Sequence, residues 1–339
     1  MTSNDLGVAI AGAGYFGAFH ADAIAELAGV RLVAICDLEP AHARHLAARH
    51  AGARVAAWPQ LLADPAVDVV VIATPHHHHH AMAVAAAAAG KHILLEKPMA
   101  LTAAECTAMI EAAERHGVKL MVGQLLHFAL PSVVGRAILQ RGELGQPLIA
   151  SSTLNKLWLE PNRRAWHLDP STGGGMLMTA GIHALDLLVW LMDAPVATVF
   201  AAAGALLHAQ AADDSALLLV RFADGRFGQV SSIGYRDGGV AYGIDLICER
   251  GSLRIDFARG VAIGRGGQWT PVAETTEPDW MARALVREWQ ALAAALRGSA
   301  PIPVSGAYGR HIIACIEAAL QSSRERREVA VAPELVVAA

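Results

Sequence analysis

The stretch that decides the fold is residues 7–37, which read GVAIAGAGYFGAFHADAIAELAGVRLVAICD. An apolar run over 7–11 is followed at once by the glycine pattern Gly12-Ala13-Gly14-Tyr15-Phe16-Gly17. Helical spacing of apolar residues comes next, and then a β-branched run that ends at Asp37. Strand, glycine turn, helix and strand within about 30 residues predict the first unit of a parallel sheet that binds a dinucleotide.

Each glycine of the pattern has its own physical task. Gly12 permits the tight turn, Gly14 lets the backbone approach a pyrophosphate, and Gly17 lets the helix pack closely on the strand. The free N–H groups at the start of the helix favour the phosphate charge. A glycine turn in an α/β protein without a nucleotide is the alternative that these residues leave open.

The acidic residue that ends the second strand points to the kind of cofactor. Asp37 follows Gly17 by 20 residues, where a carboxylate accepts hydrogen bonds from the adenosine ribose and repels a 2′-phosphate. The pattern therefore favours NAD. His42 and Arg44 lie one or two helical turns further on, so NADP stays open as the alternative.

The alternation of strands and helices continues to about residue 124. Apolar runs at the strand positions are typical of buried parallel strands, and Thr102 with Glu105 forms a capping-box pattern. We expect a doubly wound parallel sheet of the Rossmann type over residues 1–124. The expected strands after Asp37 are 67–74, 92–98 and 118–124, and the expected helices are 80–90 and 102–116.

Beyond residue 125 the pattern changes to strand pairs. The stretches 216–233 and 243–257 contain turn signals at Asp224-Gly225 and Gly251, which predict hairpins. We expect a second α/β domain over 125–339, with a mostly antiparallel open sheet, helices on one face, and a role in substrate binding and oligomerisation. Its expected helices are 173–193 (beginning after Gly175), 280–298 and 306–327, the last packing back on the first domain.

The composition raises the question of a membrane protein. Hydrophobic residues make up 54% of the 339 residues, and the mean hydropathy is +0.36. The longest uncharged stretch, 194–212, contains Pro195, Gly204 and His208 and much alanine, so it would partition weakly into lipid. We expect a strand and a loop there, and no membrane association.

Charge and cysteine usage exclude further classes. A net charge of −4 offers no basic field for nucleic acid. The first residues lack a basic segment before the apolar run, as a leader would need. The four cysteines stand far apart, which indicates reduced thiols and a cytoplasmic protein; they are Cys36, Cys106, Cys248 and Cys315.

Five consecutive histidines, 76–80, follow Thr74-Pro75 at the end of an expected strand. Adjacent side chains diverge, and no cysteine or carboxylate partner lies nearby in the sequence, so we expect no metal site. Ligands of open α/β sheets bind at the carboxyl ends of strands. The expectation is a loop over the nucleotide with partly exposed histidines.

Four stretches together resemble the Gfo/Idh/MocA oxidoreductases, a family named for glucose–fructose oxidoreductase and inositol dehydrogenase. They are GAGYFGAFH (12–20), the region 73–102 with ATPHHHHH and AGKHILLEKPMALT, GGGMLMTAGIHALDLLVWL (173–191), and DDSALLLVRFADGRFGQVSS (213–232). The resemblance implies an NAD(P)-dependent dehydrogenase or reductase. It would transfer a hydride between the nicotinamide and a secondary hydroxyl or ketone of a sugar, cyclic polyol or related cyclic diol. It also implies a homodimer or homotetramer.

The resemblance implies catalytic roles for three residues. The lysine that matches Lys97 contacts the reacting hydroxyl, and the histidine that matches His183 is the usual general acid/base. Thr179 stands where inositol-dehydrogenase-like members carry an aspartate, so His183 should be a weaker base here. Asp186 follows in the Gly-x-His-x-x-Asp pattern, where it could orient His183 or hold a neighbouring segment; we favour the structural role.

The remaining site residues follow from the same resemblance and from the polar or aromatic character of their side chains. Trp166-His167 departs from the Trp-Arg of many relatives. Expected cofactor-binding residues are Gly12, Gly14, Tyr15, Phe16, Gly17, Asp37, Thr74, Pro75, His76, His79, Glu96, Lys97 and Gln124. Expected substrate-binding residues are Lys97, His127, Lys156, Trp166, His167, Thr179, His183 and Tyr242. Two alternatives stay open: an NAD-dependent glycoside-cleaving enzyme of the same superfamily, and an inactive NAD-bound sensor or corepressor.

Overall fold

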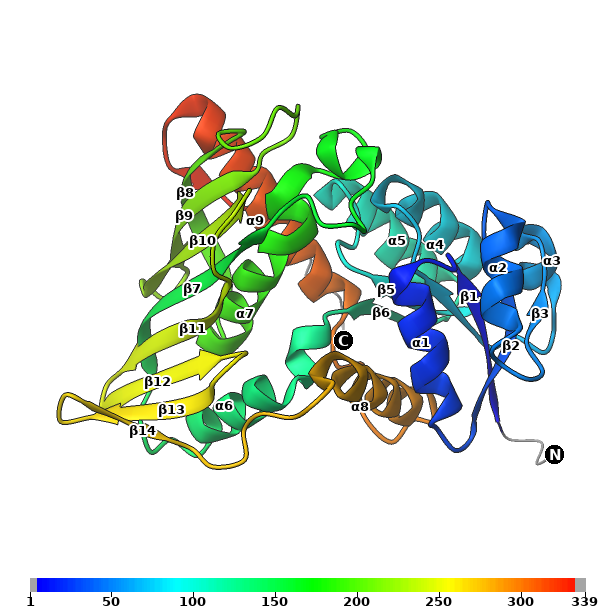
Figure 1. Cartoon of the computed structure of the whole chain (residues 1–339), viewed down its shortest axis with the longest axis horizontal. Coiled ribbons are helices and arrows are strands. Elements are labelled where there is room, and N and C mark those ends of the chain that lie inside the picture. The colour runs from blue at the N-terminus through cyan, green and yellow to red at the C-terminus, as the bar shows by residue number, and fades with distance from the viewer. Residues whose placement is uncertain (1–4, 333–339) are drawn as a thin grey trace. The chain divides into compact units, whose positions relative to one another are not determined.

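The computed structural model describes residues 5–332 of the chain (Figure 1). The chain divides into two compact units. The first contains the chain up to Ala100 together with Ala104–Leu125 and Met281–Arg310. The second contains Leu101–Ala103, Leu126–Trp280 and the chain from His311 on.

The first unit is built on a six-stranded parallel sheet in the order β3-β2-β1-β4-β5-β6. This is the Rossmann strand order and confirms the predicted fold class. The strands are β1 (Leu6–Ala11), β2 (Val30–Cys36), β3 (Arg54–Val55), β4 (Val69–Ile72), β5 (His92–Glu96) and β6 (Leu120–Gly123). The helices are α1 (Tyr15–Ala25), α2 (Pro40–Ala47), α3 (Trp58–Ala63), α4 (His79–Ala88) and α5 (Ala103–Arg115).

Burial explains why the central strands are continuous apolar runs. All four residues of β4 and the middle of β5 have almost no exposed surface. A parallel sheet is covered by helices on both faces, so its central strands have no solvent-facing side. Because the strands are parallel, the segments that follow them all leave the sheet at the same edge, the carboxyl edge.

The histidine run differs from the expected loop. Residues His76–His78 form a 3-10 turn, η1, and α4 begins at His79. His76 and His79 are buried, whereas His77 is exposed. The backbone N–H of His78 donates to the carbonyl oxygen of Pro75, so helical winding begins directly after Pro75.

The second unit contains a nine-stranded sheet in the order β14-β13-β12-β11-β7-β10-β9-β8-β15. All neighbours are antiparallel except β7 and β10, which confirms the mostly antiparallel open sheet. Hairpins join β9 to β10 and β11 to β12 at the predicted turns. The strands are β7 (Pro147–Leu157), β8 (Val196–Gly204), β9 (Ser215–Phe222), β10 (Phe227–Tyr235), β11 (Ala241–Cys248), β12 (Gly251–Asp256), β13 (Gly260–Arg265), β14 (Gln268–Pro271) and β15 (Val329–Ala330).

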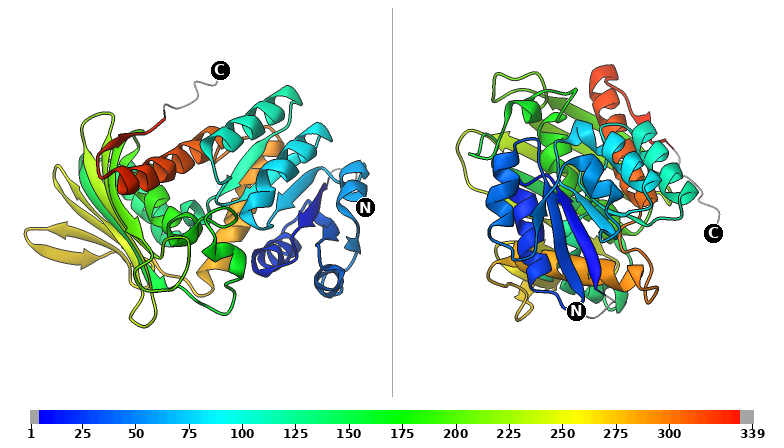
Figure 2. Two further views of the ribbon diagram at one scale, coloured as in Figure 1. Left: turned by 90° about the horizontal axis from the view of Figure 1, so that it is seen from above. Right: turned by 90° about the vertical axis from the view of Figure 1, so that its right-hand side faces the viewer.

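Helices cover one face of this sheet, as Figure 2 shows. They are α6 (Leu130–Gln140), α7 (Ile182–Met192) and α9 (Gly306–Glu325). The glycine-rich segment reaches α7 through a π-helical turn, Leu177–Gly181. Short 3-10 turns occupy Leu125–Phe128 and Ala165–Leu168.

The last two long helices belong largely or partly to the first unit, although they follow the strands of the second unit in the sequence. Helix α8 (Trp280–Leu296) lies in the first unit from Met281 on. Helix α9 begins in the first unit and passes at His311 into the second. Within residues 5–332, no helix is both long enough and apolar enough to cross a membrane. The uncharged stretch 194–212 forms β8 and the loop after it, as expected.

Candidate functional site

The glycine turn after β1 is shaped by close backbone contacts. Gly12 has a φ of +99°, and a Cβ there would lie 2.3 Å from the carbonyl oxygen of Ala73. A Cβ on Gly17 would lie 1.9 Å from the carbonyl oxygen of Gly12. By contrast, a Cβ on Gly14 would meet nothing within 4 Å. Two glycines are therefore needed by the fold, and the third borders open space at the start of α1.

Asp37 joins the end of β2 to this turn. Its Oδ2 accepts a hydrogen bond of 2.7 Å from the backbone N–H of Ala13, and its Oδ1 accepts one of 2.8 Å from Glu39. His42 lies 3.7 Å from the same carboxylate. The Asp37 side chain keeps 16% of its surface exposed. A carboxylate fixed against the turn and still accessible fits the ribose of a dinucleotide.

The segment after β5 carries the expected lysine. Glu96 is buried, and its Oε1 lies 2.9 Å from the His20 ring while its Oε2 accepts the Lys97 backbone N–H at 3.3 Å. Lys97 is half-buried, and its Nζ lies 6.0 Å from the centre of the Phe16 ring. The structure thus brings the lysine to the glycine turn at the same sheet edge.

Two further residues complete this edge. The His79 ring contacts two carbonyl oxygens, those of Thr74 and Pro98, at 2.9 Å each, so it ties the segment after β4 to the segment after β5. Burial lowers the pKa of His79. Gln124, after β6, is 1% exposed, and its Oε1 has no hydrogen-bond partner among the described residues. The open space at Gly14 and this orphaned oxygen fit a bound dinucleotide.

In the second unit, Asp186 of α7 holds His127. Its Oδ1 lies 3.0 Å from His127 Nε2, and both side chains are buried. The His127 ring stacks on Trp190 with 4.2 Å between centres. Burial and the charge of Asp186 raise the pKa of Tyr242 well above its usual value. His127 and Asp186 therefore form a buried pair, and Asp186 binds a neighbouring segment.

His183 is the second residue of α7 and is half-buried. Thr179 lies one turn earlier, in the π-helical segment, and its hydroxyl donates to the Gly173 carbonyl oxygen at 3.4 Å. The side chain that replaces the family aspartate thus contacts the backbone of the glycine-rich segment.

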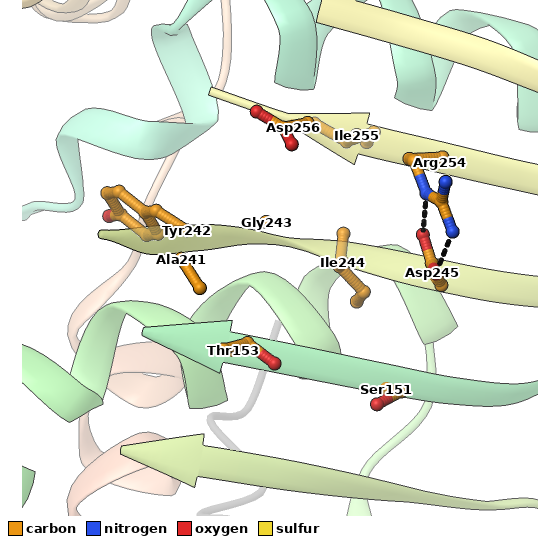
Figure 3. Close-up of a pocket in the computed structure, with 10 residues that line it drawn as sticks. All are labelled: Ser151, Thr153, Ala241, Tyr242, Gly243, Ile244, Asp245, Arg254, Ile255 and Asp256. Carbon is orange, nitrogen blue, oxygen red and sulfur yellow. Dashed lines mark hydrogen bonds and ion pairs between the residues drawn. The ribbon is translucent and has the colours of Figure 1, made fainter. Parts of the chain in front are cut away.

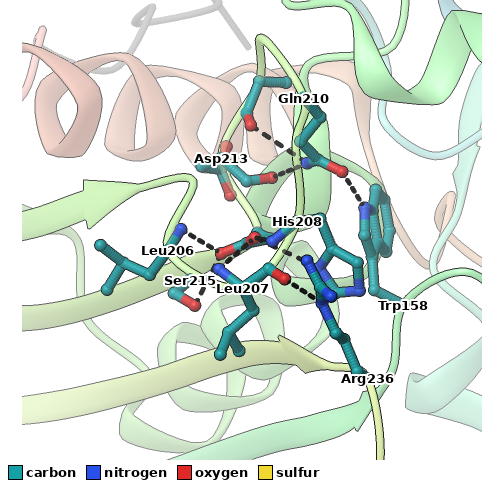
Figure 4. A network of polar contacts seen from close by, with 10 residues as sticks. Trp158, Leu206, Leu207, His208, Gln210, Asp213, Ser215 and Arg236 are labelled. Atoms are coloured by element: carbon teal, nitrogen blue, oxygen red, sulfur yellow. Dashed lines mark hydrogen bonds and ion pairs between the residues drawn. The ribbon is translucent and has the colours of Figure 1, made fainter.

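Asp213, which is not among the predicted site residues, anchors this segment. Figure 4 shows Asp213 beside Gln210, whose side-chain amide donates to the Asp213 carbonyl oxygen. Asp213 is 8% exposed, its Oδ2 accepts the Leu177 N–H at 2.8 Å, and its carbonyl oxygen accepts the Met176 N–H at 2.9 Å. Burial raises the pKa of Asp213 to about 7. The available signal was the Asp213-Asp214 pair before a strand, because two adjacent acids in an apolar context need partners.

The other predicted substrate residues surround the segment after β7. The Lys156 ammonium lies 2.6 Å from the Glu160 carboxylate, and Glu160 also pairs with Arg163. Trp166 and His167 stack with 3.6 Å between ring centres. The His167 Nδ1 accepts the Arg164 backbone N–H. Lys156 is engaged with a carboxylate of its own segment.

A shallow pocket lies on the sheet face that the helices leave bare (Figure 3). Ser151 and Thr153 of β7 line it together with Asp245 and Arg254, which form two hydrogen bonds of 2.7 Å. Tyr242 is the one predicted site residue in its lining. Among residues 5–332, no cluster of three or more histidine, cysteine or carboxylate side chains could hold a metal ion.

Comparison with known proteins gives matches along most of the chain. Residues 6–124 match the model of an oxidoreductase family with an NAD-binding Rossmann fold, and residues 135–254 match the GFO/IDH/MocA C-terminal domain. An inositol 2-dehydrogenase of Acidothermus cellulolyticus is 31% identical over 66% of this chain and 64% of its own length. A 1,5-anhydro-D-fructose reductase of Ensifer adhaerens is 32% identical over 52% of this chain and 54% of its own.

A solved structure extends the likeness to nearly the full length. The chain superposes on GenD2 from gentamicin A biosynthesis, crystallised in complex with NAD, with a TM-score of 0.86 and 27% identity over 98% of both chains. The alignments span about two thirds and about half of the two curated relatives. Both domain models carry the same family name, and the chain belongs to the Gfo/Idh/MocA family of oxidoreductases.

Proposed function

We propose that this protein is an NAD(P)-dependent dehydrogenase or reductase that acts on a secondary hydroxyl or ketone of a sugar, cyclic polyol or related cyclic diol. The observation that carries the proposal is Lys97, held at the end of β5 beside Phe16 of the glycine turn. Relatives named for inositol and for anhydrofructose support a ring-shaped polyol as the substrate class.

Several backbone and side-chain groups would hold the cofactor. The free N–H groups at the start of α1, above Gly14, suit the pyrophosphate, and Asp37 suits the ribose hydroxyls. A 2′-phosphate would place a second negative charge against the Asp37 carboxylate, so NAD is favoured over NADP. The buried Oε1 of Gln124 offers an acceptor for an amide N–H.

The bound nicotinamide supplies the hydride acceptor. Lys97 would donate a hydrogen bond to the reacting oxygen and favour its loss of a proton. His183 would accept the proton during oxidation and return it during reduction. Thr179 adds no negative charge next to His183, so the imidazole should work as a weaker base than one paired with a carboxylate.

Substrate recognition is assigned to the second unit. His127 is held by Asp186, Tyr242 stacks on Phe257, and Trp166 offers an aromatic face beside His167. Hydroxyl-binding groups next to aromatic faces suit a polyol ring, whose edges are polar and whose faces are apolar.

The test is a screen of polyols, aldoses, nucleotide sugars and dihydrodiols for NADH or NADPH formation by absorbance. Lys97→Ala should retain NAD binding, measured by calorimetry, and lose at least about 100-fold in kcat. Lys119→Ala, at an exposed position, is the control. Unchanged turnover of Lys97→Ala would contradict the assignment, and substrate cleavage without net NADH formation would favour the glycoside-cleaving alternative.

We further propose that the bare sheet face joins copies of the chain into a homodimer or homotetramer. Outward positions of such a sheet are normally polar, yet large apolar side chains occupy many of them: Ile149, Phe200, Leu217, Leu219, Phe227 and Ile247, each 41% to 56% exposed. Leu219→Glu should lower the mass measured by light scattering. Leu206→Glu, in the loop after β8, should not.

The proposed partners are limited to small molecules and further copies of the chain. All four cysteines are buried, and none of them forms a disulfide within residues 5–332, which supports a reducing, cytoplasmic location.

A further inference from the structure

A network of hydrogen bonds links three segments of the second unit (Figure 4). At its centre is the side-chain amide of Gln210, in the loop between β8 and β9. Gln210 Oε1 accepts the indole N–H of Trp158, directly after β7, at 2.7 Å. Gln210 Nε2 donates to the carbonyl oxygens of Ala212 and Asp213 at 3.0 and 2.9 Å. The proposed function does not use this side chain.

The partners of Gln210 require an amide at this position. The Trp158 side chain is wholly buried, and its N–H, which can only donate, needs an acceptor. The two carbonyl oxygens on the other side of the amide need donors. A carboxylate would offer no donor, and an apolar side chain would satisfy none of the three partners. The chemistry of the neighbours therefore fixes which way the amide of Gln210 points.

Asp213 carries this link to the start of the π-helical turn. Its carbonyl oxygen, which accepts from Gln210, also accepts the Met176 N–H at 2.9 Å. Its Oδ2 accepts the Leu177 N–H at 2.8 Å. A Cβ on Gly175 would lie 2.6 Å from Asp213 Oδ1, so the glycine-rich segment packs directly against Asp213. The end of the loop and the start of the turn are thus held together.

The π-helical turn leads directly to the proposed acid/base. Such wide winding is rare in proteins and occurs mostly as single turns, often at functional sites. The end of the turn packs on β10, since a Cβ on Gly181 would lie 2.2 Å from Ser232 Oγ. Helix α7 follows, with His183 as its second residue. If the start of the turn loses its anchor, the winding can relax towards an ordinary α-helix, and the residues that lead into α7 change direction.

We propose that Gln210 is a positioning residue for His183: its amide ties Asp213 to the buried indole of Trp158 and so holds the π-helical turn before the imidazole. A misplacement of about 1 Å in a reacting group lowers turnover by up to about 100-fold. The role of His183 in proton transfer rests on the proposed function. The link from Gln210 to the turn does not depend on that role.

The loop has anchors of its own that do not involve Gln210. The Asp214 carboxylate accepts the backbone N–H groups of Leu206, Leu207 and His208 at 2.9, 2.8 and 2.6 Å. Gln210→Met, which keeps the length of the side chain, should therefore leave the loop folded and remove its link to the turn. Arg236→Met is the matched control, because Arg236 anchors the same loop through the Leu207 carbonyl oxygen rather than through Asp213.

Hydrogen exchange tests the link in the protein without substrate. The exchange rates of the Met176 and Leu177 amides, which both donate to Asp213, are read by mass spectrometry with fragmentation. In Gln210→Met these amides should exchange at least about tenfold faster, while the amides of β11 keep their rates. In Arg236→Met both sets should keep their rates.

Kinetics test the positioning role, with NAD and the compound from the proposed screen that is turned over fastest. Gln210→Met should lower kcat at least about tenfold and change KM less than about twofold, because the imidazole is displaced without loss of a substrate contact. Arg236→Met should keep both constants. His183→Ala is measured beside them.

Each contrary result has its own meaning. Unchanged exchange of Met176 and Leu177 in Gln210→Met, or equally fast exchange in Arg236→Met, would overturn the link. Faster exchange with an unchanged kcat, where His183→Ala has lost its turnover, would overturn the positioning role. If His183→Ala keeps its turnover, the proposed function fails, and the exchange rates still decide whether Gln210 holds the turn.

Discussion

Asp213→Asn removes the titration of one carboxyl group while leaving an oxygen that can accept the Leu177 N–H. In the native protein this carboxyl group anchors the start of the π-helical turn that leads to His183. It is also held in place by Gln210, whose side-chain amide donates to the Asp213 carbonyl oxygen at 2.9 Å. The substitution therefore changes charge with little change in shape.

The size of the effect follows from the pKa. Burial raises the pKa of Asp213 from 3.8 to about 7. This is roughly three units at ~1.36 kcal/mol each, or about 4 kcal/mol. The folded protein binds the proton more tightly, so the stabilisation is complete below pH 3.8 and is lost as the pH rises through about 7. Asparagine cannot ionise, so its stability lacks this loss.

Urea unfolding at a series of pH values measures the difference. The free energy of unfolding of the native protein, minus that of Asp213→Asn, should fall by about 4 kcal/mol from about pH 4 to about pH 8. Asp224→Asn is the control. The pKa of Asp224 is lowered, with Arg226 the main cause, so its stabilisation is instead lost as the pH falls. A constant difference for Asp213→Asn would refute the argument that burial dominates this carboxyl group.

Four further substitutions test other parts of the molecule. Gly14→Ala should fold normally, since a Cβ there meets nothing within 4 Å, but calorimetry should show NAD binding weakened at least about tenfold. Gly17→Ala should have a lower thermal unfolding temperature than the native protein, because its Cβ would lie 1.9 Å from a carbonyl oxygen. Lys91→Met should lose about 2–4 kcal/mol of stability in urea, because the buried ammonium donates to two carbonyl oxygens at 2.8 Å each. Thr179→Asp should raise the pKa of His183, so the acid limb of the kcat profile should move to higher pH.

The first sheet could be predicted almost strand by strand, because its signals are local. The steric reason for Gly17 lies within the turn itself, in the carbonyl oxygen of Gly12, and buried parallel strands are recognisable as continuous apolar runs. Gly12 is recognisable from the same pattern, although the group that its Cβ would meet, the carbonyl oxygen of Ala73, comes from a distant part of the chain. The histidine run was less predictable. Polar residues after a strand suggest a loop, but the structure buries His76 and His79, and helical winding begins at His76.

The partners of the polar site residues could not be predicted in the same way. Asp186 meets His127 across 59 residues of sequence, and Trp289 meets His20 across 269. The periodicity of α8 identifies its buried face, but it does not reveal that this face brings Trp289 to His20. Such contacts depend on which elements become neighbours, and that is set by topology rather than by local pattern.

A common principle connects the two units. In each, a carboxylate accepts a backbone N–H of the segment that bears a proposed catalytic residue: Glu96 accepts from Lys97, and Asp213 accepts from Leu177, shortly before His183. These carboxyl groups fix the backbone on which the proposed catalytic side chains stand. Burial shifts one of the carboxyl groups in each unit, Glu288 and Asp213, towards its protonated form. Since a buried charge without a partner is unfavourable, the same burial that stabilises these segments also limits the negative charge that can accumulate beside them.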